Sequence, residues 1–73
     1  MSDVDVASRL AHLLPHWIEH NEAHLDTYRE WARRARDAGL EAALDALDQA
    51  VVEIARANEA LRRAIDSLPG RST

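Results

Sequence analysis

Apolar positions recur along this chain at alternating spacings of three and four residues, in two long stretches. The first contains Leu14, Ile18, Asn21, Leu25, Tyr28, Ala32 and Ala35, and the second contains Leu40, Leu44, Leu47, Val51, Ile54, Asn58, Leu61, Ile65 and Leu68. This alternation is typical of helices that pack in a left-handed coiled arrangement. In no segment do apolar and polar residues alternate with the period of two that is typical of strands, and the helix formers Ala, Leu, Glu and Arg dominate. We therefore expect an all-α fold.

Breakers and caps predict where the helices end. Ser2 followed by Asp5 resembles a capping box, so the first helix should begin near Asp3. Pro15 should break or kink it, and glycine at position 39 should end the second segment. Pro69 should stop the last helix. These signals predict a single domain, 1–73, with a short helix over 3–14, long helices over 15–37 and 40–68, and a tail over 69–73.

The two long helices should fold antiparallel about the Gly39 turn. Facing residues then have numbers that sum to 79, and the only two polar residues of the apolar seam, Asn21 and Asn58, fall in the same layer. An asparagine in an apolar seam is costly unless it is paired, and it fixes the register of the helices. Asn21 and Asn58 are thus predicted to set the register, with polar support for a nearby site as the alternative.

The two flanks of this hairpin differ in chemistry. One flank should carry ion pairs between the helices, namely Glu22–Arg62, Arg29–Asp48 and Arg36–Glu41. The other places Trp17, His24 and Trp31, seven residues apart, opposite a strip of small residues. The strip consists of Ala43, Ala50, Ala57 and Ala64. Large residues over small ones predict a homodimer interface that gives a four-helix bundle, unless residues 3–14 fold back over the strip.

Length and composition limit the function. A core made from 73 residues rarely supplies more than about 3–5 kcal/mol, so self-association or bound metal is expected. There is no cysteine, which excludes disulfides and thiolate metal sites. The net charge of −4 argues against a nucleic-acid partner. No apolar run is long enough to span a membrane, and the acidic N-terminus lacks signal-peptide features, so a cytoplasmic location is expected. No nucleophile with a positioned base is visible, and we expect no enzymatic activity.

Four histidines supply the one chemical clue. His12, His16, His20 and His24 follow one another at intervals of four residues, so successive imidazoles lie above one another on a helix and can chelate a transition metal. Expected ligands are His16, His20 and His24, with Glu53 from the facing helix; the register of His12, before Pro15, is uncertain. Zn, Ni, Co, Cu and Fe remain open as the divalent metal.

Two other interpretations of the histidines remain open. The histidines and tryptophans can form a packing surface in a structural or protein-interaction module. The histidines can also act as a pH-sensitive switch, because imidazole gains a charge between about pH 8 and pH 5. Protonation of all four would load one helix face with like charges and weaken an interface there.

One segment also resembles a known family. The resemblance is carried by the string Pro15-His16-Trp17-Ile18-Glu19-His20-Asn21-Glu22-Ala23-His24, followed by Tyr28-Arg29-Glu30-Trp31-Ala32 and Ala38-Gly39-Leu40. This segment resembles a small prokaryotic helical-hairpin domain of unknown function. The resemblance covers about residues 10 to 68. It implies that His16, Trp17, His20, Asn21 and His24 form the family signature, PHWIEHNxxH. It also implies that the domain occurs alone or attached to larger proteins, some of which handle metals.

Overall fold

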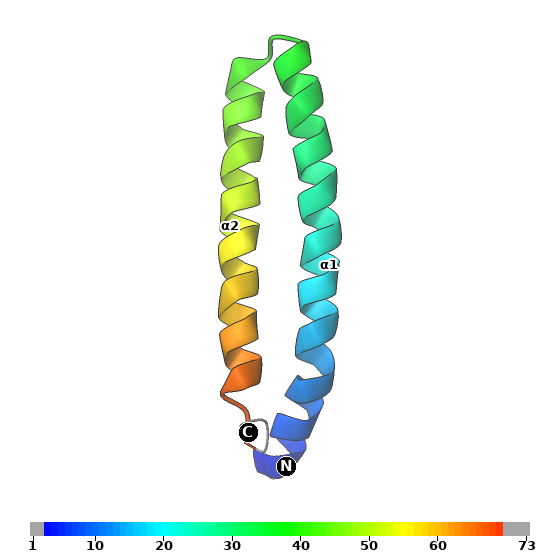
Figure 1. Cartoon of the computed structure of the whole chain (residues 1–73), viewed down its shortest axis with the longest axis vertical. Helices are drawn as coiled ribbons and strands as arrows, with labels where there is room; N and C mark the ends of the chain where they lie inside the picture. Colours follow the sequence, from blue (N-terminus) through cyan, green and yellow to red (C-terminus); the bar gives the residue numbers. More distant parts are fainter. Residues whose placement is uncertain (1–2, 70–73) are drawn as a thin grey trace.

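The protein is an antiparallel hairpin of two helices in a computed structural model that describes residues 3–69 (Figure 1). Helix α1 spans Asp3–Asp37 and helix α2 spans Glu41–Asp66. No strand occurs among the described residues, so the predicted all-helical hairpin is confirmed. Ser2 of the predicted capping box, and residues 70–73 of the predicted tail, lie outside the described part of the chain.

Gly39 makes the turn between the helices. Its φ of 73° is in the left-handed region, where glycine meets no steric cost from a side chain. The Gly39 amide donates to the Arg36 carbonyl at 3.1 Å, and the Leu40 amide donates to the Ala35 carbonyl at 2.9 Å. These two bonds form a Schellman motif, which satisfies carbonyls that the end of a helix otherwise leaves without partners. The sequence predicted this helix end correctly.

Pro15 lies inside α1 and does not end it. The predicted division into a short helix over 3–14 and a long helix over 15–37 is therefore wrong as a boundary. Proline removes one helical hydrogen bond, but Leu14 and Ile18 on either side are both buried against α2. Packing of these neighbours holds the two halves in one helix. Because α1 continues through Pro15, residues 3–14 do not fold back over the alanine strip. A kink at Pro15 stays a prediction.

Helix α1 buries its seam much better than α2 does. The buried apolar residues of the described chain all come from α1: Leu14, Ile18, Leu25, Ala32 and Ala35. On α2, the only buried residue is Asn58, and seam residues such as Val51 and Ile54 are half-buried. The side chains along one side of the α2 seam are alanines, which are too small to shield it. The apolar core is consequently open on the side of α2.

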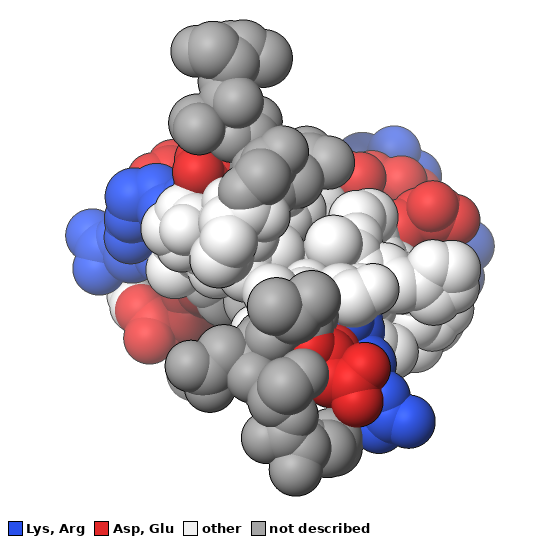
Figure 2. Space-filling model, turned by 90° about the horizontal axis from the view of Figure 1, so that it is seen from below, with Lys and Arg blue, Asp and Glu red and all other residues white. Residues whose placement is uncertain are grey.

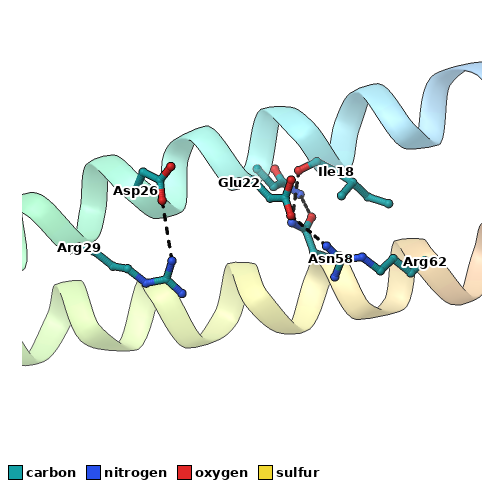
Figure 3. A network of polar contacts seen from close by, with 7 residues as sticks. Ile18, Glu22, Asp26, Arg29, Asn58 and Arg62 are labelled. Atoms are coloured by element: carbon teal, nitrogen blue, oxygen red, sulfur yellow. Dashed lines mark hydrogen bonds and ion pairs between the residues drawn. The ribbon is translucent and has the colours of Figure 1, made fainter.

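A polar layer and an ion pair join the two helices midway along the hairpin (Figure 3). The Asn21 Nδ2 donates to Asn58 Oδ1 at 2.9 Å, as the register prediction required. The predicted ion pair between Arg62 and Glu22 is confirmed, with an N–O distance of 3.0 Å. Arg29 instead pairs with Asp26 on its own helix, with a distance of 3.9 Å between Arg29 Nη1 and Asp26 Oδ1. The predicted pairing of Arg29 with Asp48 is therefore wrong.

The molecule is a rod, with extents of 53 × 21 × 14 Å and a Cα radius of gyration of 16.5 Å. A globular chain of this length has a radius of gyration of about 11 Å. The accessible surface is 5542 Å², whereas a globular monomer of this mass exposes about 4,500 Å². Neither described helix is long and apolar enough to cross a membrane.

Candidate metal centre

His20 and His24 form a pair on the exposed surface of α1. Their Nε2 atoms lie 3.1 Å apart, and the ring centroids are 4.6 Å apart with the planes nearly perpendicular, at 88°. Residues four apart on a helix lie one above the other, which brings these two rings together. At this distance one ring nitrogen can donate a hydrogen bond to the other, and the tautomers of the two imidazoles decide which nitrogen is the donor.

The separation of the two Nε2 atoms matches that of two ligands on one metal ion. With metal–nitrogen bonds of about 2.0–2.1 Å, adjacent nitrogens lie about 2.8–3.0 Å apart on an octahedral ion and about 3.3–3.4 Å apart on a tetrahedral ion. The observed 3.1 Å lies between these two values. A metal bound to both nitrogens would lie off the line that joins them, so the two rings, which are now aligned for a hydrogen bond, would have to rotate to direct their lone pairs at it.

Tyr28 supports the pair from the next turn of α1. Its ring stacks on His24 with centroids 5.7 Å apart and an interplanar angle of 24°. Tyr28 is a half-buried residue of the seam, so it links the exposed imidazole to the packed interior. The sequence placed Tyr28 in the apolar seam. Its position four residues after His24 was the signal that it also belongs to this column of rings.

The other expected ligands are not part of the pair. His16 is exposed on α1, as is His12, which was not among the expected ligands. Glu53 lies on α2, where its Oε1 accepts a hydrogen bond of 2.9 Å from Gln49 Nε2. Within residues 3–69, no group of three histidine or acidic side chains is arranged to hold a metal. The structure thus brings together two of the four predicted ligands, His20 and His24.

The asparagine layer fixes the helices at the level of the histidine pair. Asn58 is only 2% exposed, and besides its bond to Asn21 it donates through Nδ2 to the Ile18 carbonyl at 3.3 Å. Asn21 lies between His20 and His24 in the sequence, so the backbone that carries the pair is tied to α2 at this point. The layer therefore limits rotation of α1 beneath the two imidazoles.

An apolar surface, which we call the tryptophan–alanine flank, adjoins His20 and includes His24. It consists of Trp17, His24 and Trp31 of α1 and Ala43, Ala50, Ala57 and Ala64 of α2. Trp17 and Trp31 are 42% and 53% exposed, and the guanidinium of Arg34 lies 4.7 Å from the Trp31 ring centre. Seen from the end of the rod, charged side chains form separate groups, and uncharged side chains reach the surface between them (Figure 2).

Two long antiparallel helices with an exposed histidine pair define this protein as a small helical-hairpin domain. The chain belongs to the family described as a domain of unknown function, DUF8180, whose profile matches residues 10–68. No curated protein and no solved structure matches the chain. The family assignment confirms the expected domain of unknown function, and the PHWIEHNxxH signature and a prokaryotic origin stay predictions.

Proposed function

We propose that this protein binds a divalent transition metal without catalysing a reaction, and that His20 and His24 provide the first two ligands. The observation that carries this proposal is the separation of 3.1 Å between their Nε2 atoms. Imidazole is a ligand for Zn, Ni, Co and Cu, and no thiolate is present to favour softer ions. Two histidines leave further coordination positions for water or for groups from another molecule.

The supporting contacts suit a binding role. Tyr28 stacks on His24, and the bond between Asn21 and Asn58 holds the backbone beneath both histidines. Groups that orient a ligand histidine raise the affinity of a metal site, and their loss typically costs about 10–100-fold. The exposed position of the pair gives a metal direct access from solvent.

A titration with metal ions alone tests the proposal. Zn²⁺, Ni²⁺, Co²⁺ and Cu²⁺ are added separately to the parent and to a His20→Ala, His24→Ala variant, and binding is followed by calorimetry. We expect the variant to bind at least about tenfold more weakly. A His12→Ala, His16→Ala variant is the matched control, because it removes two exposed histidines from the same helix. Equal affinity of the parent and the His20→Ala, His24→Ala variant would rule out the proposed site.

The exposed tryptophans favour a second function. An interaction module would use Trp17 and Trp31 as aromatic anchors in a protein interface, where such residues are enriched. The partner would be another copy of this chain or a larger protein, such as one that handles metals. A melting temperature that depends on protein concentration but not on chelator would support this function in place of metal binding.

A further inference from the structure

We infer that a second copy of this chain completes the metal site, and that each site consists of His20 and His24 from one copy and Glu53 from the other. This inference rests on the proposed function and assigns the ligand that the single hairpin does not supply. Its basis is the tryptophan–alanine flank, where large side chains of α1 lie beside small side chains of α2. Such a surface is complementary to itself.

The direction of the two-fold axis follows from side-chain size. If the axis lies parallel to the helices, α1 of each copy faces α2 of the other, and large residues meet small ones. If the axis lies across the helices, α1 faces α1, so tryptophans oppose tryptophans and alanines oppose alanines. Close packing favours the first arrangement, because interfaces approach the packing density of protein interiors.

A two-fold axis parallel to the helices also fixes which residues meet. Rotation about it leaves every residue at its own level, and the Asn21–Asn58 bond shows that position i of α1 is level with position 79 − i of α2. Trp17 is then level with position 62 and lies between Ala60 and Ala64 of the second copy. Trp31 is level with position 48 and lies between Ala46 and Ala50. Each tryptophan thus enters a gap between two alanines.

The same register brings Glu53 of the second copy to the histidine pair. Glu53 is level with position 26, which is two residues, or about 3 Å along the helix axis, from His24 and six residues, or about 9 Å, from His20. At positions 43, 46, 50, 53, 57, 60 and 64, which form this side of α2, every residue except Glu53 is alanine. A lone carboxylate in an apolar interface is costly unless a positive partner faces it. A metal held by His20 and His24 provides that partner.

The resulting ligand set is chemically reasonable. Two imidazoles and one carboxylate form a known three-ligand set for zinc, and water takes the open position. Glu53 exchanges its hydrogen bond from Gln49 for the metal when the site forms. By symmetry, the dimer contains two such sites.

The dimensions of the single chain independently favour a partner. Its accessible surface of 5542 Å² exceeds by roughly 1,000 Å² the area that a globular monomer of this mass exposes. The half-buried seam of α2 lies next to the alanines that the second copy would cover. A dimer through this flank therefore buries apolar surface at the place where the hairpin is most open.

A mixing experiment distinguishes a site shared between copies from a site within one copy. The His20→Ala, His24→Ala chain and the Glu53→Gln chain carry different affinity tags and are produced together, and the mixed dimer is isolated with both tags. Each variant alone should bind metal at least about tenfold more weakly than the parent. The mixed dimer pairs the intact histidines of one chain with the intact Glu53 of the other. It should bind one metal with parental affinity, where the parent dimer binds two.

Each other result has a defined meaning. A mixed dimer that binds no metal tightly would place all ligands within one copy and overturn the inference. A parent that binds metal as a monomer, measured by native mass spectrometry, would overturn it as well and leave the proposed function intact. A parent dimer that binds no metal would reject the proposed function itself. Glu59→Gln, an exposed carboxylate on another face of α2, is the matched control for Glu53→Gln and should bind as the parent does.

Discussion

Asn21 and Asn58 face each other across the helix pair, with the Nδ2 of Asn21 donating to the Oδ1 of Asn58 at 2.9 Å. Asn58 is the only buried polar residue among the described residues, and it also bonds to the Ile18 carbonyl. An amide that bonds to one side chain and one backbone carbonyl defines a single register for the two helices. A shift of one helical turn would leave both asparagines among apolar residues without these partners.

Asn58→Leu should lower the free energy of unfolding by about 1–3 kcal/mol, because it leaves the Asn21 amide and the Ile18 carbonyl without their partner. Urea denaturation at fixed protein concentration measures the change. Gln49→Leu, at an exposed position of the same helix, is the control and should alter stability by less than about 0.5 kcal/mol. A destabilisation by Asn58→Leu no larger than that of the control would show that the layer contributes nothing.

The paired change Asn21→Leu with Asn58→Leu should behave differently from the single change. Replacing both polar groups leaves neither unpaired, so stability should return to that of the parent or exceed it. The register should become less well defined, because no polar pair then excludes shifted arrangements. Separate cysteine pairs measure this: one pair joins two facing positions, and a second pair joins positions one helical turn out of register, which form a disulfide only if the helices shift. A single disulfide pattern in the double variant would contradict the register role.

Gly39→Ala should destabilise the hairpin by about 1–2 kcal/mol, because a side chain disfavours the left-handed conformation. Apart from Gly39 itself and its two neighbours in the chain, no heavy atom lies within 4 Å of the position that an added Cβ would occupy. The cost consequently comes from crowding of Cβ against the adjoining backbone in this conformation, and not from contact with the rest of the protein. Gly39→Asn tolerates this conformation better and should cost less than Gly39→Ala. Thermal unfolding of both variants checks this order, and equal stability of Gly39→Ala and the parent would contradict it.

Much of the fold follows from local sequence signals. The seam spacing determines which faces of the helices meet, and Gly39 determines where the chain turns, so the register that pairs Asn21 with Asn58 was predictable. Continuity through Pro15 was not, because the burial of its neighbours in the folded chain outweighs the local cost of proline. Such packing is a property of the assembled hairpin and not of the segment.

The candidate site was less predictable than the fold. Spacing placed four histidines on one helix, but it does not determine which side-chain rotamers bring two nitrogens together. The structure pairs His20 with His24, stacks Tyr28 on His24, and directs Glu53 to Gln49. Each of these contacts depends on side-chain torsions, which a pattern of residue types leaves undetermined. The charged flank shows the same limit, since Arg29 reaches Asp26 on its own helix.

The ion pair between Glu22 and Arg62 should contribute little to stability. Its side chains are 54% and 52% exposed, and exposed pairs of this kind contribute about 0–1 kcal/mol. A double-mutant cycle with Glu22→Gln and Arg62→Gln measures the coupling energy. We expect the coupling to fall further in 1 M salt, where screening acts over about 3 Å. A coupling well above 1 kcal/mol that resists salt would show that this pair, and not the asparagine layer, holds the helices in register.

Metal should raise the melting temperature of the parent protein, because a ligand that binds only the folded state stabilises it by mass action. A metal concentration one hundred times the dissociation constant corresponds to about 2.7 kcal/mol. His16→Ala should retain this increase, since the structure pairs His20 with His24 and not with His16. His24→Ala should lose it. Melting curves with Zn²⁺ and then with chelator test both variants, and a loss with His16→Ala but not with His24→Ala would move the metal site one turn toward the N-terminus.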